Sequence, residues 1–95
     1  MRIVALRYRA GMDADSVDHG SGVQPWRQVL AILTRQIEDG TRTGALPGER
    51  HLAAELGVSP LSVRKALEAL RNAGLVETTR GYGSRVLRPE ERPER

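Results

Sequence analysis

The stretch Leu52-Ala-Ala-Glu-Leu-Gly-Val-Ser-Pro-Leu-Ser-Val-Arg-Lys-Ala-Leu67 decides the fold of this 95-residue chain. Its first leucines recur at helical spacing, and Gly57 follows them where a helix can end in a left-handed residue. Ser59 is a favourable N-cap, and Pro60 is a favourable first helical residue because an N–H at that position has no partner within the helix. The stretch therefore predicts two short helices that cross at a tight turn, a helix-turn-helix.

The second of these helices, predicted over residues 60–73, has an apolar face and a polar face. The apolar face is expected to pack in the core and comprises Val63, Ala66, Leu67, Leu70 and Ala73. In a helix-turn-helix that binds DNA, the N-terminal residues of the second helix enter the major groove. The predicted DNA contacts are therefore the cap and the exposed residues of the first two turns: Ser59, Pro60, Leu61, Ser62, Arg64 and Lys65.

Arg64 and Leu61 are the most informative of these residues. The Arg64 guanidinium can donate two hydrogen bonds to a guanine or hold a phosphate, and the sequence does not decide between the two. Leu61 has a use beside a thymine methyl group. The alternatives are that Leu61 covers the start of the helix and that Arg64 is a solvated surface charge.

An earlier helix is predicted from Pro25 until Gly40, and it supplies much of the core. Its apolar stripe comprises Trp26, Val29, Leu30, Leu33 and Ile37. We expect Trp26, the only tryptophan, to pack in the core rather than to contact a ligand or a partner. Ile32 lies off the stripe, so an exposed isoleucine there would mark a contact with a second subunit, although isolated apolar residues are common on surfaces.

The segment between the first two helices brings a further basic residue to the predicted surface. Residues 41–46 are expected to form a loop with a brief extended stretch, and the next helix begins near Gly48. Arg50 lies in the first turn of that helix, where a DNA phosphate would meet free helical N–H groups. The alternative is that Arg50 pairs with an acidic neighbour on its own helix.

A β-hairpin is predicted at the end of the folded region, after Gly74 ends the helix. Residues 75–79 and 84–87 are β-prone and are joined by Arg80-Gly-Tyr-Gly83. In a winged helix this tip lies over a neighbouring groove, where Gly81 and Gly83 let the backbone approach, Arg80 supplies charge and Tyr82 can bond a phosphate. The alternative is a plain solvent-exposed hairpin.

Length and charge place one small domain in the middle of the chain. Residues 24–88 carry ten basic and six acidic side chains, a net charge of +4, whereas residues 1–23 sum to zero and residues 89–95 to −1. A positive field on a small domain favours a polyanionic partner.

We expect an N-terminal arm and flexible linker over residues 1–23, with residues 2–9 β-prone and 11–22 mobile. The α+β winged helix-turn-helix then spans residues 24–88, and a charged disordered tail spans residues 89–95.

Several kinds of site are excluded or disfavoured. The chain has no cysteine, so it has no disulfide and no thiolate metal site, and neither a metal nor a cofactor is predicted. His19 and His51 have no partner at catalytic spacing, so we expect no catalytic residue and no enzyme activity. No segment is long and apolar enough to be a signal peptide or a membrane span, which predicts a soluble cytoplasmic protein, associated with the nucleoid if it binds DNA.

Three motifs in fixed order make the chain similar to the GntR family of bacterial regulators. They are a leading helix that ends in Glu-Asp-Gly40, the run Leu46-Pro-Gly-Glu-Arg-His-Leu-Ala-Ala-Glu-Leu-Gly-Val-Ser59, and the run Val63-Arg-Lys-Ala-Leu-Glu-Ala-Leu-Arg-Asn-Ala-Gly-Leu-Val-Glu77 with Gly81-Tyr-Gly83. The resemblance covers about residues 25–87 and implies a winged helix regulator, a repressor or an activator, on an inverted-repeat operator of double-stranded DNA. It also implies DNA contacts from Arg50, Arg64, Gly81 and Gly83.

The chain departs from the pattern of that family in four positions. Pro60 stands where an arginine is usual on the recognition helix, so the operator preference should differ. Tyr82 occupies a position that is often basic, Arg85 one that is often apolar, and Gly48 replaces the usual serine cap at a cost of a few tenths of a kcal/mol.

The resemblance also implies partners. Members of the family usually continue into a larger effector-binding and dimerising domain, and residues 1–95 show no evident small-molecule effector pocket. We expect a homodimer through the N-terminal arm or the first helix, because two half-sites raise affinity through effective concentration. The alternatives are that the protein binds as a monomer or that partners supply the missing contacts. Two alternative functions remain: a winged-helix protein–protein interaction module, and a protein that binds DNA independently of sequence. The salt dependence of binding separates the first from a DNA-binding protein, and a preferred site excludes the second.

Overall fold

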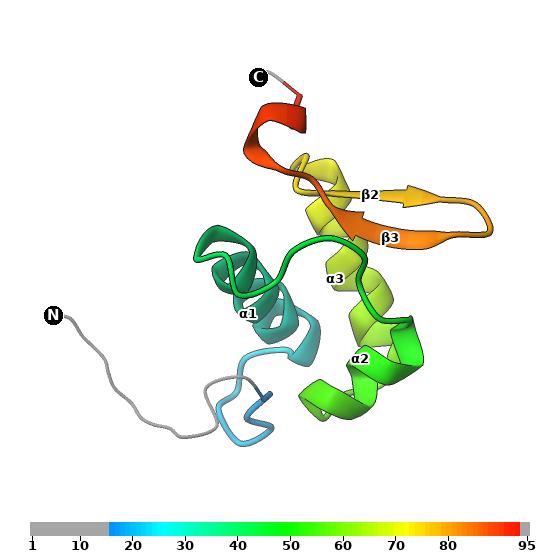
Figure 1. Cartoon of the computed structure of the whole chain (residues 1–95). Coiled ribbons are helices and arrows are strands. Elements are labelled where there is room, and N and C mark those ends of the chain that lie inside the picture. Colours follow the sequence, from blue (N-terminus) through cyan, green and yellow to red (C-terminus); the bar gives the residue numbers. More distant parts are fainter. Residues whose placement is uncertain (1–15, 94–95) are drawn as a thin grey trace, which may run out of the picture.

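A computed structural model of the chain describes residues 16–93, and the predicted β-prone arm at residues 2–9 lies outside them. Three helices come first: α1 (Pro25–Glu38), α2 (Glu49–Leu56) and α3 (Pro60–Asn72). Two antiparallel strands follow, β2 (Val76–Thr79) and β3 (Gly83–Val86), and then a short 3-10 helix, η1 (Pro89–Glu91). Figure 1 shows the hairpin projecting away from the helices as a wing. This is the predicted α+β winged helix.

The turn between α2 and α3 forms as the sequence predicts. Gly57 ends α2 with φ +76°, and the N–H groups of Gly57 and Val58 both donate to the carbonyl of Ala53. Ser59 is the N-cap of α3, where its Oγ accepts a hydrogen bond of 3.2 Å from the N–H of Ser62. The left-handed glycine and the serine cap together set the crossing of the two helices.

One hydrophobic core lies where the three helices and the base of the wing meet. Its fully buried side chains come from every helix and include Val29, Leu33, Leu52, Leu56, Val63 and Leu70. Val76 and Val86, paired across β2 and β3, close it from the wing side. On the predicted apolar face of α3 all positions are buried except Ala73, which is exposed because it is the C-cap residue after the last full turn.

Two expectations about α1 are wrong. Ile32 is only 8% exposed and belongs to the core, because the buried face of α1 is wide enough to include it. It therefore marks no subunit contact. Trp26, expected in the core, is half-buried at the start of α1 and lies outside the core cluster.

The wing is supported at its base by the loop that precedes α2. Ala45 forms an isolated bridge with Arg85, and two backbone hydrogen bonds join the loop to β3, from Leu46 N–H to Ser84 O and from Val86 N–H to Gly44 O. The predicted extended stretch in residues 41–46 is thus present and pairs with the outer edge of β3. Near the tip, Tyr82 N–H donates to Thr79 O and closes the turn.

The N-terminal part of the described chain makes hydrogen bonds to the helices. Gln28 on α1 accepts a hydrogen bond from Asp18 N–H and donates to Asp18 O, Ser21 Oγ and Val23 O, at 2.8–3.0 Å. The N–H of Val17 donates to Leu56 O at the end of α2. A single side-chain amide therefore joins residues 18–23 to α1, and the mobility of residues 11–22 stays a prediction.

The C-terminal segment makes hydrogen bonds to β3 and the residues that follow it. Glu91 in η1 accepts hydrogen bonds from the Arg85 side chain and from Arg88 N–H, and Arg92 donates to Leu87 O. Glu91 thus meets a partner of the opposite charge on β3, and the disorder of residues 89–95 stays a prediction.

Candidate nucleic-acid interface

The exposed face of α3 carries Arg64, which is held by a carboxylate from α2. The guanidinium Nη2 donates to Glu49 Oε1 at 2.9 Å, and Nε lies 3.2 Å from both carboxylate oxygens. This hydrogen bonding raises the pKa of Arg64 above its ordinary value. The side chain stays 62% exposed, so Arg64 is neither a free solvated charge nor a buried one. It is an oriented cation at the surface.

A hollow beside α3 gathers residues from α2, α3 and the wing. It is lined by Leu46, Pro47, Gly48, Glu49, Arg50, Leu67, Arg71, Thr78, Tyr82, Gly83 and Ser84. Arg50, Tyr82 and Gly83 were predicted as DNA contacts, and the fold brings them to one surface. Arg50 is exposed, and among residues 16–93 it pairs with no carboxylate, so the alternative of an intrahelical pair does not hold.

Arg71 belongs to this hollow and was not predicted as a site residue. Its Nη1 donates to Thr78 Oγ1 at 2.9 Å, and Thr78 Oγ1 lies 2.7 Å from Ser84 Oγ. Arg71 thus connects α3 to both strands of the wing. Spacing alone would have found it, because Arg71 lies seven residues after Arg64 and so two turns along the same face of α3.

The remaining predicted residues of α3 are placed in different ways. Leu61 is 66% exposed beside the exposed Pro60. The hydroxyls of Ser59 and Ser62 are hydrogen-bonded to each other at 3.2 Å, so both take part in the cap. Lys65 lies over the ring of Trp26, on the side of α3 that faces α1. Lys65 and Arg64 therefore point to different sides of the helix.

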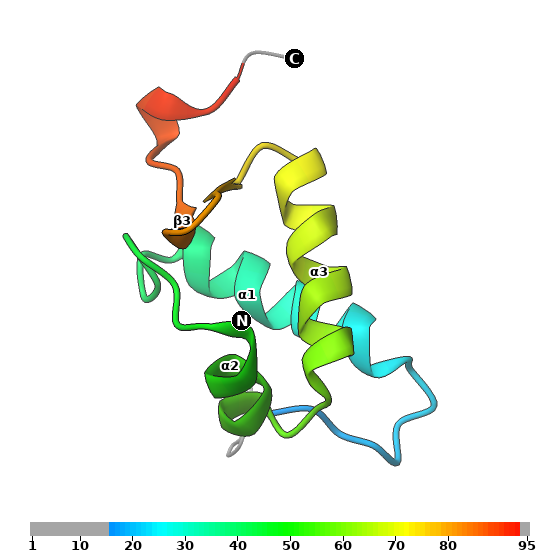
Figure 2. The ribbon, with the colours of Figure 1, turned by 90° about the vertical axis from the view of Figure 1, so that its right-hand side faces the viewer.

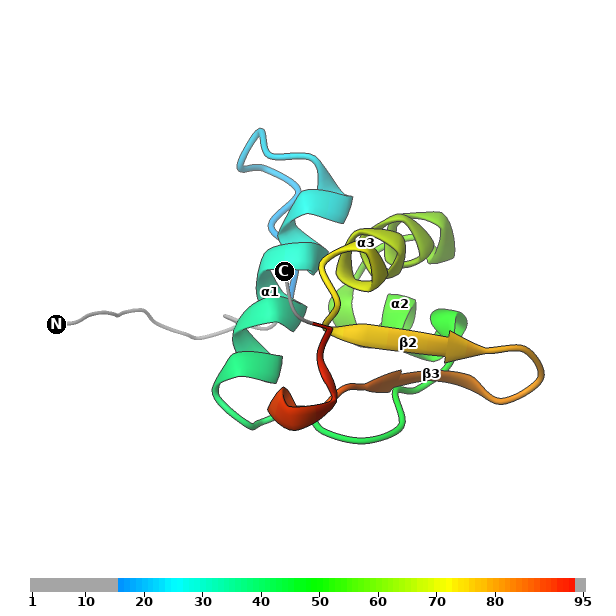
Figure 3. The same cartoon turned by 90° about the horizontal axis from the view of Figure 1, so that it is seen from above.

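The wing tip is fully exposed. Tyr82 is 88% exposed, and Arg80, Gly81 and Gly83 are exposed with it. Gly81 and Gly83 have φ values of +84° and +82°, which L-residues adopt only with strain, so the tight tip requires glycine at both positions. The tip extends well beyond the helices in Figure 3, with no segment of residues 16–93 covering it.

The arrangement of three helices and a wing matches a known family of proteins. The family model described as "Bacterial regulatory proteins, gntR family" matches residues 25–86. The chain belongs to this family.

Relatives and solved structures of gntR-type domains agree with the assignment. The chain is 40% identical over 81 residues to an uncharacterized HTH-type transcriptional regulator, RB1450, of Rhizobium meliloti, covering 83% of this chain and 33% of the relative. It is 32% identical over 77 residues to the HTH-type transcriptional repressor NagR of Bacillus subtilis, covering 79% of this chain and 32% of NagR. The DNA-binding domain of AraR, solved in complex with operator ORX1, superposes with a TM-score of 0.69 at 26% identity, covering 76% of this chain and 94% of that one.

The gntR-family chain spans about a third of the length of these two curated relatives. The described part of the domain contains no cluster of histidine, aspartate and glutamate that could hold a metal ion. Within residues 16–93, no helix combines the length and the apolar character that crossing a bilayer requires.

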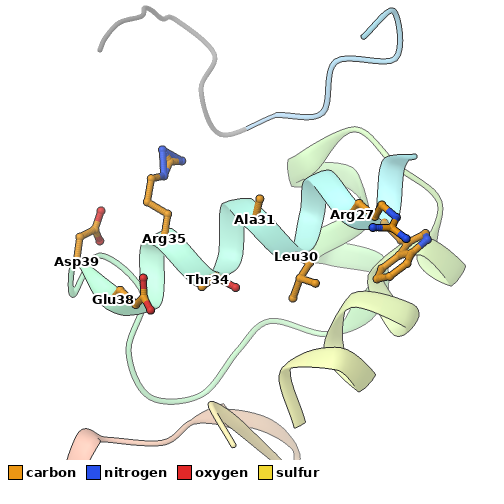
Figure 4. Close-up of a pocket in the computed structure, with 8 residues that line it drawn as sticks. Arg27, Leu30, Ala31, Thr34, Arg35, Glu38 and Asp39 are labelled. Carbon is orange, nitrogen blue, oxygen red and sulfur yellow. The ribbon is translucent and has the colours of Figure 1, made fainter. Parts of the chain in front are cut away.

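A second hollow of the gntR-type domain runs along the outer face of α1. It is lined by Trp26, Arg27, Leu30, Ala31, Thr34, Arg35, Glu38 and Asp39. Figure 4 shows Arg27 toward one end of the helix and Glu38 and Asp39 toward the other. These lining residues belong to α1 and its C-cap Asp39, so no second element within residues 16–93 lines the hollow.

Proposed function

We propose that this chain is a sequence-specific regulator of transcription that binds double-stranded DNA and represses the genes beside its operator. The observation that supports this proposal best is that the fold superposes on a DNA-binding domain solved in complex with operator DNA. The chain also has the exposed helix and wing that such a domain needs. The repressor assignment is supported by NagR, a relative named as a repressor.

In this proposal α3 enters the major groove and the wing tip lies over an adjacent groove. The start of α3 contacts bases through Pro60, Leu61 and Arg64. Arg50 and the tip residues Arg80, Gly81, Tyr82 and Gly83 contact the backbone of the DNA, and Ser59 and Ser62 keep the start of α3 in place. Leu61 supports this orientation, since a two-thirds exposed leucine gains most beside a thymine methyl group.

The pair with Glu49 leaves Arg64 enough donors to read a guanine. A guanidinium has five N–H groups, and Glu49 takes the Nε–H and one N–H of Nη2. Three N–H groups remain, of which a guanine needs two, at O6 and N7. We therefore propose that Arg64 reads a guanine while Glu49 holds its orientation.

Selection of bound fragments from random duplexes tests the proposal directly. The purified chain is expected to enrich one sequence, with an affinity that falls by about 0.9 log units per tenfold rise in salt for each phosphate neutralised. Arg64→Ala is expected to cost about 1–3 kcal/mol and to relax the preference at one base pair. Binding without enrichment would indicate sequence-independent coating of DNA, and an interaction insensitive to salt would indicate a protein-binding module instead.

We also propose that two copies bind an inverted repeat as a homodimer, through the outer face of α1 or the N-terminal arm. The face of α1 offers apolar atoms of Leu30 and Ala31 between positive and negative side chains, a pattern that can complement itself across a two-fold axis. Light scattering of the full chain is expected to give the mass of a dimer, and Ala31→Arg to give that of a monomer if α1 is the contact. A monomer mass for the unaltered chain, alone and on its selected DNA, would overturn the proposal.

A further inference from the structure

The indole of Trp26 holds two cations from two different helices. Lys65 Nζ of α3 lies 5.0 Å from the ring centroid, and Arg27 Cζ of α1 lies 5.1 Å from it. The indole Nε1 donates to Gln24 Oε1 at 2.9 Å, which fixes the ring at the start of α1. Both distances are within the range of a cation–π attraction, so the ring orients the two side chains.

This cation cluster, Arg27, Trp26 and Lys65, keeps its full positive charge. Other arginines of residues 16–93, namely Arg42, Arg64, Arg85 and Arg88, are each paired with a carboxylate. A ring attracts a cation without neutralising it, and the side chains of Arg27 and Lys65 are both exposed. Two like charges held within about 5 Å of one ring at a surface raise the positive potential there and attract an anion.

The cluster lies on the side of α3 opposite the wing. In Figures 2 and 3, α3 has the wing on one side and the N-terminal end of α1 on the other. Helix α3 also packs against both α1 and α2. A helix in the major groove lies between two phosphate backbones, and the hollow with Arg50 and Arg71 lies on the wing side of α3.

We propose that Arg27 and Lys65, oriented by Trp26, bind phosphates of the DNA backbone on the side of the major groove opposite the wing. The ligand is the phosphodiester backbone of a duplex. Lys65 is then a backbone contact rather than the base contact expected from its position in the sequence. The inference rests on the proposed function, and it adds Arg27, positioned by Trp26, to the proposed interface.

Salt-dependent binding of the full chain to its selected duplex tests this site. The slope of log affinity against log salt is negative. We expect Arg27→Gln and Lys65→Gln each to make it shallower by about 0.9, and the double variant by about 1.8, without changing the preferred sequence. The charge-preserving variants Arg27→Lys and Lys65→Arg should keep the slope of the unaltered chain. Arg88→Gln, which removes an exposed charge beyond the wing, is the matched control and should keep it too.

Ethylation of single phosphates locates the contact. For the unaltered chain, modified phosphates should interfere with binding on both edges of the groove, and the double variant should lose the interference on one edge only. A double variant with an unaltered slope and an unaltered interference pattern would overturn this inference while the proposed function stood. If the unaltered chain failed to bind any duplex, both proposals would fall together.

Discussion

Arg64 and Glu49 form the pair on which the specificity of the proposed interface depends. The carboxylate is 34% exposed and the guanidinium 62% exposed, and a pair at such a surface adds little to the free energy of folding. Its effect is on orientation, because three short contacts hold the guanidinium plane in one direction. Glu49 is also an acidic group at the edge of the proposed phosphate-binding surface. It therefore weakens the binding of any duplex that makes no specific contact with the oriented Arg64.

Removal of the Glu49 carboxylate is therefore expected to trade specificity for affinity. In Glu49→Gln, binding to a scrambled duplex should strengthen, and the preference for the selected operator should fall by about 1 kcal/mol, roughly fivefold. Affinities for both duplexes at one salt concentration measure the change. Thermal unfolding of the same variant controls for folding, and its free energy of unfolding should change by less than about 1 kcal/mol. An unchanged preference would show that Glu49 does not position Arg64.

Glu91 makes the stability of the chain depend on pH in the acid range. Hydrogen bonds from Arg85, and then from Arg88 N–H, lower the pKa of this carboxyl from 4.5 to about 2. A carboxyl whose pKa is lower in the folded chain stabilises the fold above its unfolded pKa, and the contribution disappears as pH falls through the folded value. The stabilisation is thus complete above about pH 5 and lost between about pH 4.5 and pH 2.

The variant Glu91→Gln tests this dependence. We expect it to melt at a lower temperature than the unaltered chain at pH 7, by an amount that shrinks below pH 4.5 and vanishes near pH 2. Melting curves of both proteins across this range provide the measurement. A difference that persisted unchanged at pH 2 would exclude the ionised carboxyl as its cause.

At the scale of elements, the start of α2 is the least well capped point of the helix-turn-helix. Gly48 is its N-cap, with φ −65° and ψ 164°, and no side chain accepts a hydrogen bond there. A Cβ at Gly48 would meet no atom within 4 Å, and the backbone angles suit any residue. The chain therefore lacks a stabilising contact that its backbone could accommodate. By contrast, Gly57 at the end of the same helix has φ +76° and is required by the turn.

The variant Gly48→Ser is expected to stabilise the chain by about 0.5 kcal/mol, since serine caps a helix somewhat better than glycine. The matched control, Gly57→Ser, should destabilise it by about 1–2 kcal/mol, because an L-residue is strained in the left-handed region. Urea unfolding at neutral pH compares the two. Equal effects of the two substitutions would contradict the assignment of their backbone conformations.

At the scale of the whole molecule, the ends of the described chain are held by single side chains on the core elements. Gln28 binds residues 18, 21 and 23, and this segment in turn places Val17 against the core and its N–H on the end of α2. His19 Nε2 lies 2.6 Å from Gly57 O, at the turn that leads into α3. The N-terminal segment therefore contacts the helix-turn-helix at the end of α2 and at the turn that follows it.

The variant Gln28→Ala should release this segment without unfolding the domain. The loss of its hydrogen bonds is expected to cost about 1–2 kcal/mol, and the amide of Val17 should lose most of its protection from hydrogen exchange. Gln24→Ala, which removes one amide contact with Trp26, is the control and should leave that protection in place. Continued protection of Val17 in Gln28→Ala would show that the segment is held by other contacts.

Local patterns in the sequence determined the three helices, the turn between α2 and α3, the wing and the identity of the family. These features depend on contacts between near neighbours: the left-handed Gly57, the Ser59 cap, the apolar spacing of α3 and the glycines of the wing tip. The predicted DNA contacts at Arg50, Arg64 and the tip follow from the same patterns and remain predictions about binding. Ile32 and Trp26 were misplaced because helical periodicity gives the direction of a side chain and not the width of the face that its neighbours cover.

Only the tertiary structure decided how charged and polar side chains pair across the chain. Arg64 meets Glu49 from 15 residues away, Arg42 reaches Glu55 at 2.7 Å, and Lys65 lies over Trp26. The same holds for Gln28 and Glu91, whose partners lie on other segments of the chain. The physical reason is that these side chains are long and their partners distant in sequence, so the packing of the helices alone selects which of several possible partners each one reaches.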